Sequence, residues 1–174
     1  MIFGLDPGFS AANATGVALY DYGRVLFADV IRRNAKLSDL DAMLDIAQKA
    51  VGWATWRAKV GEIVFVTEWP QVYPDERKKD PNTAVLPLCG IIGHVSALLP
   101  TRTVSRVIYR PRAWKGTIKG DAFLLRIEER LTPDERAVLN AVMPAGLRHN
   151  AMDATGLCLK HAGRLERMRA FHAE

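Results

Sequence analysis

The chain has 174 residues, of which 49% are hydrophobic and 25% charged, so it is long enough to bury a core and too apolar for a disordered protein. Its formal net charge of +5 suits a polyanionic partner such as nucleic acid, although many proteins without such a partner share it. Cys89 and Cys158 are the two cysteines, and they form neither a Cys-x-x-Cys zinc motif nor a disulfide framework. We therefore expect a cytoplasmic protein, and the early acid Asp6 argues against a signal peptide.

The N-terminal part of the chain predicts three strands. A short apolar strand covers residues 2–5 and ends at Asp6, and residues 15–21 and 24–31 predict two more strands. Between these two, Tyr22 and Gly23 form a tight hairpin signal. The sheet should therefore begin with antiparallel pairing.

Helices and strands then alternate. A capping pattern at Ser38 and Asp41 begins a helix that should reach about residue 54, and residues 63–66 (IVFV) are apolar on both faces, as in a central parallel strand. The remaining elements expected are an exposed loop at 69–81, a helix at 82–99, a strand at 104–109, a helical turn at Pro111, and helices at 121–131, from Thr132, and from 149 to near Arg169. This order predicts one domain over residues 1–174, with a mixed five-stranded α/β sheet covered by helices on both faces.

Residues 81–101 contain no Lys, Arg, Asp or Glu, which is a run long enough to span a bilayer. However, the run also holds two glycines, Asn82, His94 and internal prolines, which lower its hydrophobicity. We expect a buried helix at a subunit interface, and no membrane span.

Three acids fall at positions where their side chains can meet. Asp6 ends the first strand, Glu68 follows the central strand, and Asp153 lies among small and apolar residues of the last helix. If the first and central strands are neighbours, their acids project from one edge of the sheet. Carboxylates that lie so near one another repel unless a cation lies among them. Mg²⁺ or Mn²⁺ is the cation that such ligands prefer. The chemistry of such a cluster is phosphodiester hydrolysis with two ions. A turn residue at Asp6 and a solvated strand end at Glu68 remain alternatives.

Several segments resemble the RuvC-type Holliday-junction resolvases. Residues 2–8 (IFGLDPG) with residues 15–18 (TGVA) look like that family's opening motif, and residues 64–68 (VFVTE) resemble its second acidic position. Residues 111–115 (PRAWK) with Lys119 and Gly120 are similar to its proline-to-lysine segment, and Asp153 with Ala154 resembles the closing metal-binding motif. The segments occur in the family's order and cover nearly the whole chain.

The resemblance implies a ribonuclease H-like fold and an Mg²⁺- or Mn²⁺-dependent endonuclease for DNA recombination and repair. Such an enzyme is a homodimer that nicks two strands of a four-way junction symmetrically and leaves 3′-hydroxyl and 5′-phosphate ends. A two-fold dimer matches a roughly two-fold junction. We expect the uncharged helix at 82–99 to form the dimer interface.

One position departs from the family pattern. Many members carry an acid or a histidine three residues before the last aspartate, where this chain has Asn150, preceded by His149. Positions three and four before Asp153 share its helical face. His149 is thus a candidate metal ligand or proton shuttle, and Asn150 a candidate neutral metal ligand. A helix-start histidine without a catalytic part is the alternative for His149.

Two basic groups are candidates for DNA binding. The loop after Glu68 carries Arg77, Lys78 and Lys79, and the proline segment carries Arg112, Lys115 and Lys119. In the same loop, Trp69 and Tyr73 could stack on an unpaired base at a junction. A solvated surface is the alternative for the basic groups, and packing is the alternative for Trp69. We expect the basic residues near the C-terminus, which are Lys160, Arg164, Arg167 and Arg169, to form a solvated helix face.

Three other functions compete with junction cleavage. Sugar kinases and actin-like ATPases share this topology and an Asp-x-Gly hairpin, but they need a second domain for which the chain has no room. A junction-binding protein without activity is the second rival, and Asn150 favours it. An RNA-processing nuclease of the same superfamily is the third.

Overall fold

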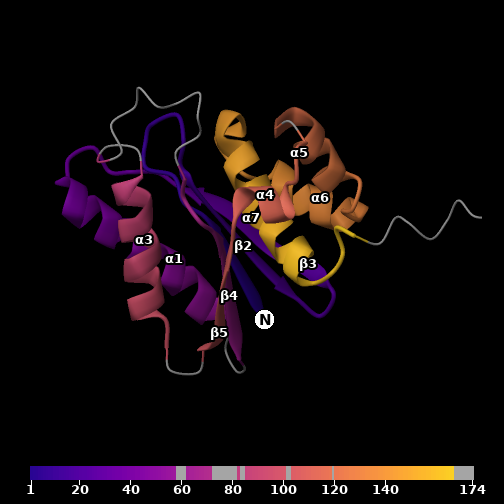
Figure 1. Ribbon diagram of the computed structural model, residues 1–174, viewed down its shortest axis with the longest axis horizontal. Coiled ribbons are helices and arrows are strands. Elements are labelled where there is room, and N and C mark those ends of the chain that lie inside the picture. The colour runs from indigo at the N-terminus through magenta and orange to yellow at the C-terminus, as the bar shows by residue number, and fades with distance from the viewer. Residues whose placement is uncertain (58–61, 72–81, 83–84, 101–102, 119, 167–174) are drawn as a thin grey trace, which may run out of the picture.

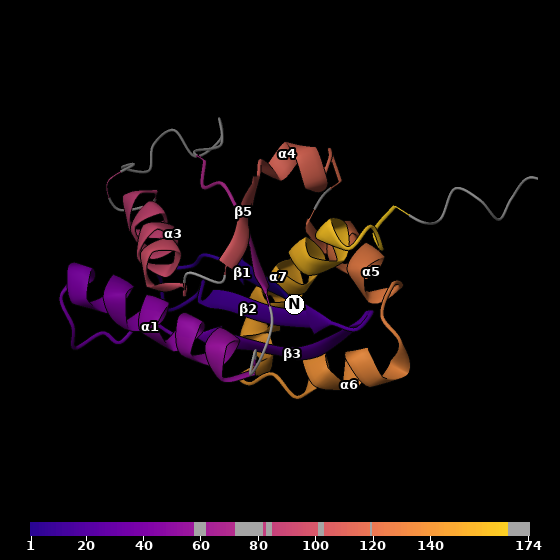
Figure 2. The same cartoon turned by 90° about the horizontal axis from the view of Figure 1, so that it is seen from below.

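In the computed structural model, a mixed five-stranded sheet lies between two layers of helices (Figures 1 and 2). The structure describes residues 1–57, 62–71, 82, 85–100, 103–118 and 120–166. The strands are β1 (Ile2–Asp6), β2 (Thr15–Asp21), β3 (Arg24–Ile31), β4 (Ile63–Glu68) and β5 (Thr103–Tyr109). The helices are α1 (Asp39–Arg57), α3 (Leu86–Leu98), α4 (Pro111–Trp114), α5 (Gly120–Glu128), α6 (Pro133–Asn140) and α7 (Arg148–His161), with a 3₁₀ turn at Ala145–Leu147.

The order of the strands is β3-β2-β1-β4-β5. β1 pairs antiparallel with β2 and parallel with β4, and β5 continues the parallel side. The mixed ribonuclease H-like sheet predicted from the sequence is therefore confirmed, including the neighbouring first and central strands. The hairpin is also as expected, because Tyr22 and Gly23 both have positive φ angles, 48° and 82°, and join Asp21 to Arg24 in register.

Side chains along the central strands point alternately to the two faces of the sheet, so the core has two parts. One face of the sheet buries Phe3, Leu5 and Phe65 against α1 and α3. The other face presents Gly4, Ala18 and Val66 to α7, which α5 and α6 flank (Figure 2). Because side chains alternate across a strand, Asp6 shares the α7 face with Gly4, and Glu68 shares it with Val66. Strand parity thus assigns both acids to the side of the sheet on which α7 lies.

The last helix is shorter than the sequence indicated. α7 ends at His161, whereas we expected a helix to near Arg169. Gly163 has a φ of 69°, its N–H donates to the Lys160 carbonyl, and the Arg164 N–H donates to the Leu159 carbonyl. This pair of bonds is a Schellman motif, which ends a helix at a glycine. Arg167 and Arg169 lie outside the described residues.

Arg164 was expected on a solvated helix face, and this expectation is wrong. Its guanidinium donates to both oxygens of the buried Glu135 carboxylate, at 2.6 and 2.9 Å, and also to the carbonyls of Gly23 and Arg130. Glu135 accepts further bonds from the backbone N–H groups of Val25 and of Thr132, the N-cap residue of α6, with which it forms a capping box. These bonds hold the pKa of Glu135 down at about 2, despite its burial. One carboxylate therefore ties α6 to β3 and to the chain after α7.

Glu135→Gln should destabilise the fold by roughly 3 kcal/mol near pH 7, because a partly buried guanidinium loses its counter-charge. The lowered pKa means that the charge of Glu135 stabilises the fold above the unfolded-state pKa near 4.5 and that this contribution is lost as the pH falls towards 2. The difference between wild type and variant should therefore shrink from pH 6 to pH 3 in denaturant unfolding. Asp45→Asn, which breaks an exposed pair with Lys49, is the control and should cost no more than about 0.5 kcal/mol. An equal loss in the two variants would contradict the buried pair.

Among the helices that the structure describes, none is long and apolar enough to cross a bilayer. α3, which covers most of the uncharged run, instead packs against α1 and buries Ile91, Ile92 and Val95 in the core. The expectation of a packed helix at this place is confirmed.

Candidate active site

Glycines let α7 approach the sheet closely beside Asp6. Gly16 lies opposite Asp6 in the β1–β2 register, and a Cβ atom there would come within 1.9 Å of the Asn150 carbonyl oxygen. On β1, a Cβ atom at Gly4 would come within 2.4 Å of the Ala154 carbonyl oxygen. The backbone of α7 therefore rests on these two glycines. This contact brings Asp153 to the edge of the sheet where Asp6 and Glu68 lie.

The three predicted acids share this edge with one lysine. Lys115 Nζ lies 3.1 Å from Glu68 Oε2 and 3.5 Å from Asp153 Oδ1. The indole Nε1 of Trp114 donates to the same Glu68 oxygen at 2.7 Å. Asp6 interacts electrostatically with Asp153, Lys115 and Glu68. The acids from β1, β4 and α7 thus converge, as the sequence predicted, and Lys115, directly after α4, supplies the ammonium between them.

Burial raises the pKa values of all three acids, and like charges raise those of Asp6 and Glu68 further. Burial is the largest cause for Asp6, Glu68 and Asp153. The negative charge of Asp153 adds to the rise in the pKa of Asp6 and of Glu68, and Glu68 adds further to that of Asp6. Lys115 opposes the rise at all three carboxyls. The three acids in turn raise the pKa of Lys115 and keep it charged. The site therefore favours additional positive charge.

The donor types fit a hard divalent cation, since converging carboxylates are the ligands that Mg²⁺ and Mn²⁺ prefer. Within the described part of the chain, however, no group of three His, Cys, Asp or Glu side chains forms a ready-made metal site. The Lys115 ammonium bridges two of the carboxylates instead. A cation would therefore have to share the cluster with Lys115 or displace its contacts.

His149 and Asn150 have different surroundings. His149 is exposed, lines a cleft with Asp153, and its Nδ1 lies 3.2 Å from the Gly146 carbonyl oxygen. Asn150 is buried, and its amide donates to the Leu147 carbonyl in the first turn of α7. Of the two residues, His149 is thus the one beside Asp153 on the open side, and it lowers the pKa of Asp153 electrostatically.

The cleft has a volume of about 520 Å³ and lies between α7 and the segment from α4 to α5. His149, Asp153 and Lys115 line the side nearest the acids, and Ile118, Asp121 and Leu124 belong to the rest of the wall. This cleft is the open space beside the carboxylate cluster in the described residues.

The predicted DNA-binding residues are only partly described. Trp69 is half exposed next to Glu68, and its N–H extends the β4–β5 pairing to the Tyr109 carbonyl. Arg112 is exposed on α4, and Lys115 lies in the carboxylate cluster. Tyr73, Arg77, Lys78, Lys79 and Lys119 lie outside the described residues.

Sequence reasoning did not single out two kinds of residue at this site. Trp114, which donates to Glu68, stands out in the sequence only as part of the 111–115 segment, where its position next to Lys115 is the available signal. Gly4 and Gly16 belong in the sequence to the 2–8 and 15–18 segments, and the structure shows that their role is steric.

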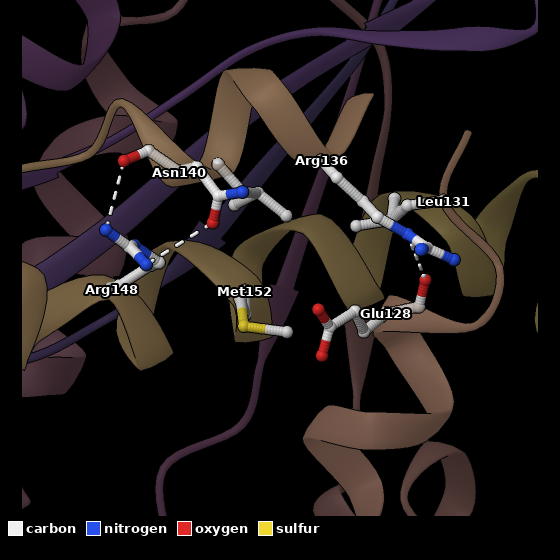
Figure 3. Close-up of a pocket in the computed structure, with 7 residues that line it drawn as sticks. Glu128, Leu131, Arg136, Asn140, Arg148 and Met152 are labelled. Atoms are coloured by element: carbon white, nitrogen blue, oxygen red, sulfur yellow. Dashed lines mark hydrogen bonds between the residues drawn. The ribbon is translucent and has the colours of Figure 1, made fainter. Parts of the chain in front are cut away.

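A second cavity, of about 130 Å³, lies between α5, α6 and α7 on another side of α7 (Figure 3). In it, Arg148 donates to the side chain and the carbonyl of Asn140, at 3.3 and 3.0 Å. Arg136 donates to the Glu128 carbonyl. Because Asn140 is the last residue of α6, Arg148 fastens the start of α7 to the end of α6, which helps to fix His149.

Solved structures share this architecture. The structure of Thermus thermophilus RuvC in complex with a Holliday junction substrate matches with a TM-score of 0.59 and 17% identity, over 92% of this chain and 92% of that one. Another T. thermophilus RuvC structure gives 0.54 and 16% with the same coverage. The chain has a RuvC-like fold. The yeast mitochondrial Holliday junction resolvase matches with a TM-score of 0.50 and 12% identity, over 98% of this chain and 83% of that one. No family model and no curated protein sequence matches the chain.

Gly16→Ala should destabilise the protein by about 1–3 kcal/mol or more, because its methyl group meets backbone that cannot swing aside. Denaturant unfolding measures the loss. Gly52→Ala is the matched control, since a Cβ atom there meets nothing within 4 Å on α1, and helix propensity predicts a gain of up to about 1 kcal/mol. If the two variants are equally stable, α7 does not rest on Gly16.

Lys115→Met should raise the pKa values of Asp6, Glu68 and Asp153, because it removes the charge that lowers all three while keeping an apolar stem beside Trp114. Carboxyl ¹³C NMR titration of the metal-free protein measures these values. Lys49→Met, which changes an ammonium paired with Asp45 on α1, should leave them unchanged. Unaltered titration in Lys115→Met would place the ammonium away from the cluster.

Proposed function

We propose that this protein is a divalent-metal-dependent endonuclease that resolves four-way DNA junctions by paired, symmetric nicks. The observation that carries the proposal is the cluster of Asp6, Glu68 and Asp153 around Lys115, at one edge of a sheet with a RuvC-like fold. Fold alone does not define an activity, so the argument rests on the cluster. Its acids repel one another and its one ammonium does not balance them, which suits a site that binds metal ions and phosphate.

Asp6, Glu68 and Asp153 would hold the metal ions, of which we propose two, and His149 rather than the buried Asn150 would complete the set. When bound, such ions lower the pKa of a water molecule and stabilise the leaving oxygen of the phosphodiester. Lys115 would pair with an oxygen of the phosphate being cut, which a point charge on a flexible stem can do. Trp114 would keep Glu68 oriented through its indole hydrogen bond.

Contacts with DNA outside the cluster are expected from α4 and the strand ends. Arg112 is exposed one turn from Lys115 and would bind a neighbouring phosphate. Trp69, half exposed directly after Glu68, is placed to stack on a base at the centre of a junction. Tyr73, Arg77, Lys78, Lys79 and Lys119 remain proposed contacts.

We also propose that two copies act together inside the cell, in DNA recombination and repair, and that each copy supplies one site. A two-fold dimer presents two equivalent sites to the two halves of a junction. α3 is the proposed interface, since Leu86 and Leu98 are 57% and 41% exposed on a helix without charged residues. Each half of the dimer would be a single domain over residues 1–174.

One observation favours a second function. Lys115 partly neutralises the acids, and no three of the described acid, histidine or cysteine side chains form a ready-made metal site. Both features would suit a protein that binds junctions and does not cut them. An RNA-processing nuclease of the same fold would use the same acids, and only its substrate would distinguish it from a junction resolvase.

A labelled four-way junction, a linear duplex and an RNA–DNA hybrid should be incubated with the protein and Mg²⁺ or Mn²⁺. We expect paired nicks in the junction with 5′-phosphate ends, little cutting of the duplex, and a loss of at least about 100-fold in Asp6→Asn, because one metal ligand is gone. Asp29→Asn, which changes a carboxylate on β3 outside the cluster, should cut normally.

The outcomes separate the alternatives. Tight junction binding without cutting under either metal would leave a junction-binding protein. Preferred cutting of the hybrid would indicate an RNA-processing enzyme. Equal activity in Asp6→Asn and wild type would remove the cluster from the reaction.

A further inference from the structure

We propose that the second cavity, between α5, α6 and α7, binds a backbone phosphate of the junction about three nucleotides from the cut. Arg136 of α6 and Arg148 of α7 are the residues that would hold this phosphate. The inference rests on the proposed function, because it takes a DNA junction as the ligand. It gives a role to residues that the carboxylate cluster does not use.

The first turns of α7 place the two openings side by side. His149 and Asp153 line the cleft beside the carboxylates, and Arg148 and Met152 line the second cavity. The members of each pair are four residues apart, so each pair follows one stripe along the helix. The two stripes are one residue out of step, which is a rotation of about 100°. The cleft and the cavity therefore flank neighbouring faces of α7.

The width of the helix determines which phosphate can reach the cavity. A helix with its side chains is about 10–12 Å across, and the two openings are separated by about that width. A DNA strand advances about 3.4 Å per nucleotide, so a strand that crosses the start of α7 spans this distance in about three nucleotides. The positive end of the helix dipole lies along this path and favours the phosphates that cross it. A strand held at Lys115 thus brings a later phosphate to Arg148.

The hydrogen-bond donors of the cavity suit an anion. Figure 3 shows Arg148 with Asn140 on one side of the cavity and Arg136 with Glu128 on the other. Arg148 donates to Asn140 through both terminal nitrogens, whereas its Nε is buried without a partner among the described residues. In the same part of the chain Arg136 makes one hydrogen bond, from its Nε to the Glu128 carbonyl. Both terminal nitrogens of Arg136 can therefore donate to phosphate oxygens, which guanidinium groups bind through paired N–H donors.

The size of the cavity also favours a phosphate. Its volume is about 130 Å³, well below the roughly 300 Å³ at which small-molecule pockets begin, so a whole nucleoside does not fit. The apolar part of its wall is formed by Leu131, Leu139 and Met152. Charge attraction is stronger beside such side chains than in open water, because the local dielectric constant is lower.

Glu128 is the one acid of the cavity wall, and it opposes an anion. Its carboxylate forms no ion pair with another of the described residues. Two guanidinium groups and one carboxylate leave the wall with one net positive charge. The acid therefore weakens the binding of a phosphate and does not prevent it. Removal of this acid should strengthen binding, which is the opposite of what loss of a DNA contact would do.

The first test measures binding of a labelled four-way junction by Asp6→Asn protein, so that cutting does not interfere. In this background, Arg136→Gln should weaken binding by about fivefold and reduce the slope of log affinity against log salt by about 1, since one phosphate contact is lost. Glu128→Gln should strengthen binding by about twofold, because the acid no longer repels the phosphate. Misfolding cannot produce this gain. Arg148 is left unchanged because it also joins α7 to α6.

Two variants with the same changes of charge are the controls. Lys49→Gln removes a positive charge from α1, which packs on the other face of the sheet, and should keep affinity within about 1.5-fold. Glu129→Gln removes an acid next to Glu128 that does not line the cavity. It should raise affinity by less than about 1.5-fold, because water and salt screen its charge.

The second test locates the phosphate. In a series of junctions, each phosphate near the cut is replaced in turn, on either strand, by an uncharged methylphosphonate. We expect the replacement about three nucleotides from the cut to weaken binding by Asp6→Asn protein roughly fivefold. In protein that also carries Arg136→Gln, the same replacement should weaken binding by less than about twofold, because the partner of that phosphate is already missing.

The outcomes distinguish the two proposals. Unchanged binding in both Arg136→Gln and Glu128→Gln would overturn the inference and leave the resolvase function standing, and it is the result expected if the cavity takes a carboxylate of a partner protein. Methylphosphonate effects that persist in full in Arg136→Gln would place that phosphate elsewhere and would also overturn it. Absence of both binding and cutting by wild type would remove the proposed function and the inference with it.

Discussion

Close contact between α7 and the sheet is the constraint on which the site depends. The helix backbone lies against Gly4 and Gly16, where any side chain would overlap the carbonyl oxygens of Ala154 and Asn150. Asp153, which directly precedes Ala154 in the helix, is thereby fixed relative to the strand ends. Because interiors are packed without spare room, small residues at these two positions set the distance between sheet and helix.

The same contact brings three carboxylates together, and the residues at the end of α4 and directly after it offset their negative charge. Burial raises the pKa values of the three acids, and repulsion adds to the rise at Asp6 and Glu68, which by itself would favour their neutral forms. The adjacent residues Trp114 and Lys115 provide an indole donor and an ammonium, and both lower the pKa of Glu68. The charge of the cluster is thus moderated by the protein itself. Under the proposed function, the ammonium that stabilises the acids is also the one that meets the substrate phosphate.

Much of the fold could be predicted because its signals are local. The hairpin at Tyr22 and Gly23, the helix start at Thr132 and the apolar first strand each depend on neighbouring residues, and all are present. The end of α7 was missed, although Gly163 carried the signal, because the basic residues after it were taken to continue the helix. The buried pair of Arg164 and Glu135 could not be predicted, since 29 residues separate its members and nothing local distinguishes this arginine from solvated ones.

The sequence by itself determined which acids end the strands and, through strand parity, on which face of the sheet they lie. Only the tertiary structure decided that Lys115 lies between the carboxylates, that Trp114 binds Glu68, and that His149 rather than Asn150 lines the cleft. The reason is physical: backbone periodicity is a local property, whereas the rotation of a helix and the partner of a charge depend on how distant segments pack.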